Sequence, residues 1–113
     1  MNDLSLKHCK ACEGGIPRLT QLEIPKYLQD LPNWTVNEDY SEISRTFHFK
    51  NFFKTMAFVN MVAWVAHQEN HHPTMKIGFN ECTVYYSTHA VLGLTENDFI
   101  CAAKINQFID DNA

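Results

Sequence analysis

The chain has 113 residues, a formal net charge of −4 and 12% aromatic residues. This length suits one domain with one core, and an acidic chain without a stripe of Lys and Arg does not have the composition of a nucleic-acid binder. No stretch approaches the roughly 20 apolar residues of a membrane span, and the N-terminus lacks the apolar run of a signal peptide, so we expect a cytoplasmic protein with reduced cysteines.

The start of the chain carries little periodicity, and glycines and a proline interrupt any local element. We therefore interpret residues 1–19 as an N-terminal tail, ordered at most in part, and residues 20–113 as a single domain. The domain begins with a short predicted helix over residues 23–31, because Pro25 suits a first helical turn and Pro32 ends the helix.

Alternation with a period of two predicts a hairpin next. Residues 34–36 form its first strand, and turn residues separate this from a second strand over residues 42–50. One face of the second strand is apolar apart from Arg45, and His48 lies on the other face as an exposed residue. The second strand is therefore expected to be half-buried.

The clearest helical pattern spans residues 51–70, with Asn51 as the N-cap. Apolar residues occupy two faces of this helix, so it carries more apolar surface than one sheet would cover. We hypothesise that part of this surface packs against another subunit.

A second hairpin follows, with strands over residues 74–80 and 81–89 and a turn around Asn80 and Glu81. Alternation along the last strand places His89 on its polar face, where it does not replace a core residue. The chain ends in an amphipathic helix over residues 95–111.

This last helix begins with a capping box, in which Thr95 is paired with Asp98 in place of the usual Glu. Its predicted buried stripe consists of Phe99, Ala102, Ala103, Ile105, Phe108 and Ile109. The order of helix, hairpin, helix, hairpin, helix predicts an α+β fold of two layers. In this fold a four-stranded antiparallel sheet has the helices packed on one face.

Three histidines are the candidate functional residues. Pro73 biases His72 away from the helical region, so the preceding helix must stop near Asn70 and hold both His71 and His72 in an extended turn. The second hairpin returns His89 toward them. Imidazoles titrate near neutral pH, and a converging set of them suits acid–base catalysis. The other interpretations are a zinc site and ordinary polar loop residues.

A second candidate for metal binding lies in "HCKAC" near the start of the chain. Cys9 and Cys12 have the CxxC spacing and His8 adds a third donor, but a structural zinc site needs a fourth ligand. Cys82 and Cys101 are far away in the sequence. We therefore expect two reduced thiols in a solvent-exposed tail, and no metal.

Several motifs together resemble the pterin-4a-carbinolamine dehydratase family, also called 4a-hydroxytetrahydrobiopterin dehydratases. They are "HHP" at 71–73, an aromatic residue at Phe79, "STH" at 87–89 and "GLTENDF" at 93–99. The segments "CKACEGGIPRLT", "LPNW", "ISRTFHFKNF" and "FVNMVAWVAHQENHHP" are similar to the bacterial branch, so the resemblance covers nearly the whole chain.

The resemblance implies an enzyme that dehydrates a tetrahydropterin 4a-carbinolamine to the quinonoid dihydropterin, without metal or organic cofactor, in the recycling that serves aromatic amino acid hydroxylases. It also implies a homodimer or homotetramer. By resemblance, His72 and His89 act as acid and base and His71 assists from the ring-nitrogen side. The residues that would contact the pterin are Asn70, His71, His72, Pro73, Ser87, Thr88, His89 and Ala90. Asp98 would support the region of His89.

Two positions depart from the family pattern. His67 stands where the family usually has an acidic residue. The sequence is compatible with two placements of His67, in the same cleft or on the solvated side of its helix. Thr74 follows Pro73 where Asp or Glu is usual. The alternative function is a non-catalytic oligomeric binding or regulatory protein of the same fold.

Overall fold

The computed structural model describes residues 3–10 and 16–111. Cys12, one of the two cysteines of the predicted tail, lies outside these residues. The helices are α1 (Ile24–Leu28), α2 (Phe52–Glu69) and α3 (Glu96–Asp111), and the strands are β1 (Thr35–Val36), β2 (Ile43–His48), β3 (Thr74–Ile77) and β4 (Glu81–Tyr86). Two short 3-10 helices, η1 (Asp3–Leu6) and η3 (His89–Val91), complete the described elements. No described helix is long and apolar enough to cross a membrane.

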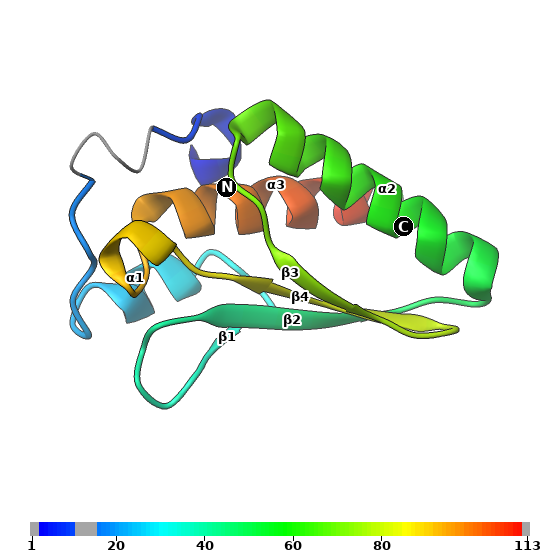
Figure 1. Cartoon of the computed structure of the whole chain (residues 1–113), viewed down its shortest axis with the longest axis horizontal. Coiled ribbons are helices and arrows are strands. Elements are labelled where there is room, and N and C mark those ends of the chain that lie inside the picture. Colours follow the sequence, from blue (N-terminus) through cyan, green and yellow to red (C-terminus); the bar gives the residue numbers. More distant parts are fainter. Residues whose placement is uncertain (1–2, 11–15, 112–113) are drawn as a thin grey trace.

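The four strands form one antiparallel sheet in the order β1-β2-β4-β3. Helices α2 and α3 lie side by side over one face of this sheet (Figure 1). The prediction of a two-layer α+β fold is therefore confirmed. The central pairing of β2 with β4 joins the two hairpins, so it is the contact that turns two local units into one sheet.

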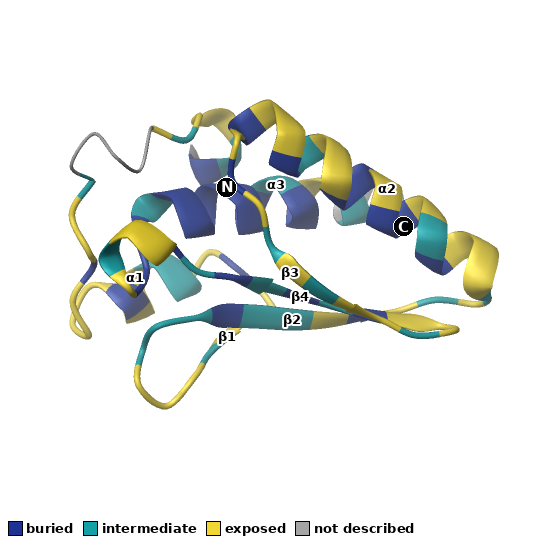
Figure 2. Cartoon of the chain, in the orientation of Figure 1, coloured by how far each residue is buried: buried dark blue, intermediate teal, exposed yellow. Residues whose placement is uncertain are grey.

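The core lies between the sheet and the two long helices, where the buried residues gather (Figure 2). Its fully buried members from the sheet are Ile43, Cys82, Val84 and Tyr86. They occupy alternate positions, as the period of two predicts, because successive side chains of a strand point to opposite faces. Arg45, which interrupts the apolar face of β2, packs its guanidinium 4.3 Å from the ring centre of Phe47.

Helix α2 buries only one of its two apolar faces. Asn51 caps the helix by accepting a hydrogen bond from the Lys54 N–H at 2.9 Å, as predicted. The buried face includes Phe58, Val62 and Ala66. On the opposite side Phe53 is 77% exposed and other large apolar side chains are exposed as well, so the excess of apolar surface inferred from the sequence is present in the structure.

Three local predictions are wrong. The turn of the second hairpin ends before Glu81, because Glu81 already pairs with His48 in the sheet. The Gly78 N–H bonds to the Glu81 carbonyl at 2.8 Å and closes the turn one residue earlier than predicted. Strand β4 ends at Tyr86, so His89 does not extend it. Phe108 is 44% exposed and does not belong to the buried stripe of α3, although its neighbour Ile109 still packs against the core.

Candidate active site

Helix α2 ends in a left-handed residue that turns the chain toward the candidate site. Asn70 has a φ of 52° and a ψ of 43°, a conformation that Asn adopts more readily than most residues. The His71 N–H bonds back to the Ala66 carbonyl at 3.1 Å, and Pro73 follows two residues later. The predicted stop near Asn70 is confirmed, and it sets the direction of the two histidines.

His71 points into the protein and is tied to a carboxylate. Its Nε2 lies 2.6 Å from Oδ1 of Asp98, and only 7% of its side chain is exposed. A carboxylate can only accept, so Nε2 carries the proton and donates. The other ring nitrogen, Nδ1, is then without a proton in the neutral imidazole. Asp98 therefore fixes both the orientation and the tautomer of His71.

Asp98 is fully buried and accepts hydrogen bonds from three donors. Besides His71, the Thr88 hydroxyl donates to Oδ2 at 2.8 Å and the Thr95 N–H donates to Oδ2 at 3.0 Å. The contact with Thr95 confirms the predicted capping box. A buried carboxylate needs such donors to offset the loss of water. Asp98 thus joins the loop of His71 to Thr88, the residue that precedes His89.

Tyr86 is a second support of His71 that the sequence did not single out. The two rings stack with 5.3 Å between their centroids, and the Tyr86 hydroxyl donates to the His71 carbonyl at 3.2 Å. Burial raises the pKa of the Tyr86 hydroxyl and the neighbouring Cys101 raises it further, so the hydroxyl stays protonated and remains a donor. The only signal in the sequence was the place of Tyr86 on the apolar face of its strand.

His72 and His89 are both exposed, in contrast to His71. Strand β3 pairs with β4 in the register Thr74 to Tyr85, and this register carries the two histidine segments to the same end of the sheet. His71 and Thr88 are buried, whereas the residues that follow them, His72 and His89, are exposed. His89 begins η3, and a bridge between Thr88 and Gly93 closes the loop around it.

The remaining predicted residues differ in exposure. Asn70, Ala90 and His67 are exposed, and Pro73 and Ser87 are partly exposed. His67 lies in the last turn of α2.

Thr88 is 1% exposed, and both its hydroxyl and its backbone are already hydrogen-bonded. Thr88 therefore holds the segment in place rather than offering free groups to a ligand.

A cavity of about 220 Å³ opens beside His89. Its lining residues are Asn37, Ser41, Glu42, Ser87, Thr88, His89, Leu92 and Gly93. The first three come from the β1–β2 turn, which the sequence alone does not connect with the site. Nothing in their local sequence marks them, because only the pairing of β2 with β4 brings that turn to this end of the sheet.

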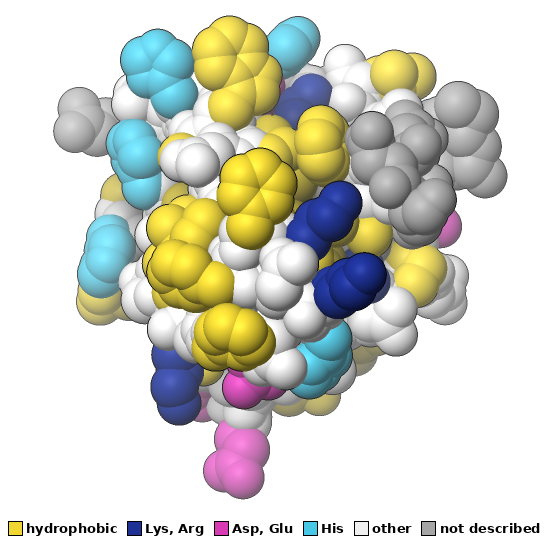
Figure 3. Space-filling model, turned by 90° about the vertical axis from the view of Figure 1, so that its right-hand side faces the viewer, with side chains coloured by type: hydrophobic (Ala, Val, Ile, Leu, Met, Phe, Trp, Pro, Cys, Tyr) yellow, Lys and Arg dark blue, Asp and Glu magenta, His cyan; other side chains and the backbone are white. Residues whose placement is uncertain are grey.

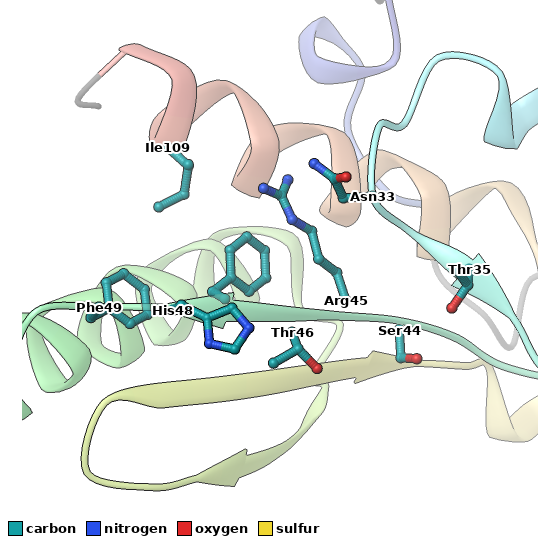
Figure 4. Close-up of a pocket in the computed structure, with 9 residues that line it drawn as sticks. Asn33, Thr35, Ser44, Arg45, Thr46, His48, Phe49 and Ile109 are labelled. Carbon is teal, nitrogen blue, oxygen red and sulfur yellow. The ribbon is translucent and has the colours of Figure 1, made fainter.

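A second cavity, of about 780 Å³, lies along β2 on the side of β1 (Figure 4). The Arg45 side chain rises from β2 toward Asn33, and Ile109 of α3 lies at another edge of the lining. None of the three candidate histidines lines it. Cavity volume therefore does not identify the candidate site. Its distinguishing feature is His71, anchored on Asp98, at the same end of the sheet as two exposed histidines.

A metal centre receives no geometric support. Within residues 3–10 and 16–111, no group of three or more His, Cys, Asp or Glu side chains is arranged to hold a metal ion. His71 is tied to Asp98, and His8 contacts Glu69 with 2.9 Å between Nδ1 and Oε2.

Comparison with known proteins decides the family. Residues 17–108 match the model of the family described as pterin 4 alpha carbinolamine dehydratase. The chain belongs to this family. A protein of Nitrosomonas eutropha is 54% identical over 108 residues, which cover 95% of this chain and 94% of that protein. A protein of Legionella pneumophila is 52% identical over 111 residues, or 97% of this chain and 98% of that protein. Both carry the provisional name pterin-4-alpha-carbinolamine dehydratase.

Two solved structures share the fold. The crystal structure of a transcriptional coactivator/pterin dehydratase from Brucella melitensis matches with a TM-score of 0.77 and 33% identity, covering 80% of this chain and 97% of that one. A pterin dehydratase-like protein identified as a RuBisCO assembly factor in the alpha-carboxysome matches with a TM-score of 0.58 and 20% identity, covering 69% of this chain and 90% of that one. The second likeness concerns the fold alone.

Proposed function

We propose that the protein dehydrates a tetrahydropterin 4a-carbinolamine to the quinonoid dihydropterin by histidine acid–base catalysis. The observation that carries this proposal is the arrangement of the three histidines in a chain of this family. His71 is anchored on buried Asp98, while His72 and His89 are exposed at the same end of the sheet. The proposed reaction uses no metal and no organic cofactor.

The chemistry needs one proton donor and one proton acceptor. The 4a-hydroxyl leaves as water once an acid protonates it, and the neighbouring ring nitrogen must lose its proton to a base. We assign the acid and base roles at the hydroxyl to His72 and His89, whose exposed rings are able to exchange protons with water. We assign Nδ1 of His71 to the ring-nitrogen side, because the hydrogen bond from Nε2 to Asp98 leaves Nδ1 as the accepting nitrogen of the neutral imidazole.

The pterin would lie against the two segments that carry the histidines. Its contacts are expected from Asn70 to Pro73 and from Ser87, His89 and Ala90. The cavity beside His89, at about 220 Å³, is smaller than the roughly 300 Å³ at which enclosed ligand sites begin, which suits a ring bound at an open surface. Thr88 contributes by holding Asp98 and the loop.

We further propose that the active form is a homodimer or homotetramer. Phe52, Phe53 and Trp64 on α2 and Phe79 in the β3–β4 turn are exposed by 51%, 77%, 61% and 66%. Hydrophobic side chains gather on the face seen in Figure 3, which shows the molecule from the end where α2 begins. Exposed apolar side chains of this kind mark interaction surfaces.

We also propose that the dehydratase serves the recycling of the reduced pterin used by an aromatic amino acid hydroxylase.

A kinetic assay tests the proposal directly. The 4a-carbinolamine is generated enzymatically, and its loss is followed by ultraviolet absorbance with and without the protein. We expect His72→Ala and His89→Ala each to slow turnover by roughly 10²-fold, because each variant removes one proton-transfer group.

His48→Ala is the matched control. His48 is also an exposed histidine, 74% by side chain, but it lies on β2 with its Nδ1 3.6 Å from Oε2 of Glu81 at the opposite end of the sheet. This variant should turn over at the wild-type rate. A wild-type rate no faster than the uncatalysed reaction would reject the dehydratase and favour the non-catalytic binding protein. Activity that resists a chelator is expected if no metal takes part.

A further inference from the structure

The N-terminal segment, defined as residues 3–10, is docked on the rest of the protein. Leu4 is 7% exposed and belongs to the core, and the Lys104 ammonium donates to the Ser5 carbonyl at 2.8 Å. Lys10 and Asn97 exchange two hydrogen bonds, one from the Lys10 N–H at 3.0 Å and one back to the Lys10 carbonyl at 2.7 Å. This part of the predicted tail is thus held against α3.

The docking brings Cys9 to Cys101, contrary to the expectation of isolated and exposed thiols. The two Sγ atoms lie 3.6 Å apart although the residues are 92 positions apart in the sequence. Cys9 is partly buried and Cys101 is fully buried. The Cys9 N–H donates to Oε1 of Glu69 at 2.6 Å, and its thiol donates to the Asn97 carbonyl at 3.5 Å. Contacts on three sides therefore hold Cys9 in this position.

We propose that Cys9 and Cys101 form a disulfide when the protein meets a peroxide, and that this bond locks the N-terminal segment onto α3. A disulfide requires the sulfurs to come about 1.6 Å closer, to the roughly 2.0 Å of an S–S bond. Cys9 lies outside any helix or strand, so its segment is able to provide this movement. Cys101 is fully buried within α3, so we expect it to move less than Cys9.

The chemistry balances with a peroxide as the oxidant. The Cys9 thiolate attacks one peroxide oxygen, the O–O bond breaks, and the leaving oxygen takes up the proton to depart as water or an alcohol. Cys101 then attacks the sulfur of the resulting sulfenic acid, the S–S bond forms, and the hydroxyl leaves with the Cys101 proton as a second water. The two sulfurs together lose two electrons, and the peroxide gains them.

The surroundings of Cys9 make its oxidation slow. The hydrogen bond with Cys101, burial, and the negative charge of Glu69 all raise the pKa of the Cys9 thiol above its ordinary value. Only the thiolate attacks, so little of Cys9 is reactive at neutral pH. Once a sulfenic acid has formed, Cys101 is already within reach and completes the bond without an encounter step.

The disulfide would lie directly behind the candidate site. Glu69, which binds the Cys9 N–H, is the last residue of α2 before the loop of Asn70 and His71. Cys101 follows Asp98 by one turn of α3. The bond would therefore tie α3, which carries Asp98, to the N-terminal segment, whose Cys9 N–H binds Glu69 two residues before His71.

Peroxide treatment of the full chain tests the proposal. The reduced protein is exposed to hydrogen peroxide, and intact mass and peptide mapping report which thiols have joined. Cys12→Ser and Cys82→Ser are matched controls that each remove one of the other two cysteines. We expect both controls to lose two hydrogens and to yield the linked peptide of Cys9 and Cys101, and Cys9→Ser to yield none. A reductant should reverse the change.

Thermal unfolding gives a second readout, because a bond that closes so long a loop constrains the unfolded chain. The midpoint of the oxidised Cys12→Ser variant should rise by at least about 5 °C over its reduced form. A peptide joining Cys9 to Cys12 in the wild type, or oxidation of the Cys12→Ser variant without a link to Cys101, would overturn the proposal. Neither readout depends on dehydratase activity, so the two proposals fail separately.

Discussion

Replacing Asp98 by Asn tests the central contact of the candidate site. The substitution keeps the size and shape of the side chain but removes its charge and turns one acceptor oxygen into a donor. In the wild type the two oxygens accept from His71 Nε2 at 2.6 Å, from the Thr88 hydroxyl at 2.8 Å and from the Thr95 N–H at 3.0 Å. The Asn side chain has one acceptor oxygen in place of two. Its N–H₂ group must therefore face either His71 or the two threonines, in the position where the wild type has an acceptor.

The expected loss of stability follows from these three bonds. A hydrogen bond to a charged group contributes about 1.5–3 kcal/mol and a neutral one about 0.5–1.5 kcal/mol, so weakening all three costs about 3 kcal/mol. Asp98 is fully buried, and water therefore does not screen the effect. In a domain of this size the midpoint of thermal unfolding should fall by roughly 10–15 °C. Turnover should fall by roughly tenfold or more, because His71 no longer has a fixed tautomer.

Urea unfolding followed by circular dichroism measures the stability change, and the carbinolamine assay measures turnover. Glu38→Gln is the matched control, because it removes one carboxylate charge at an exposed position in the β1–β2 turn. An unfolding free energy for Asp98→Asn within about 0.5 kcal/mol of the wild type would refute the reasoning, since surface substitutions reach that size.

Three further outcomes are expected. Phe53→Ser should shift the sedimentation coefficient toward that of a monomer. The control Leu22→Ser, at a position outside α2 that is 84% exposed, should not. A wild type that sediments as a monomer would contradict the proposed oligomer. Burial raises the pKa of Glu69, but the hydrogen bonds to its carboxylate lower it further, so the net pKa is below its ordinary value. The stability that Glu69→Gln removes should therefore be complete above about pH 5 and disappear as pH falls through the lowered pKa. Unfolding measured across this pH range checks the prediction. Asn106→Ala removes an oxygen that accepts from the Trp34 indole N–H at 2.7 Å and from the Arg45 guanidinium at 2.6 Å. The variant should lose about 1–3 kcal/mol of stability in urea unfolding, and no loss would mean that these two bonds do not contribute.

The sequence predicted the elements well where local physics decides them. Alternation in β2 and β4 reflects the pleat of a strand, and the cap at Asn51 and the stop near Asn70 reflect unpaired backbone groups and the constraint of Pro73. The same reasoning placed His89 wrongly, because alternation does not show where a strand ends. That end depends on the bridge between Thr88 and Gly93, a contact that alternation along the strand does not predict.

The sequence by itself also determined the identity of the candidate residues, since the motifs around His71, His72 and His89 are continuous in the chain. Their different environments were decided only by the tertiary structure. His71 meets Asp98 from a helix 27 residues later, and Cys9 meets Cys101 across 92 residues. Local periodicity carries no information about such pairs, because their distance is set by how the sheet and helices pack and not by spacing along the chain.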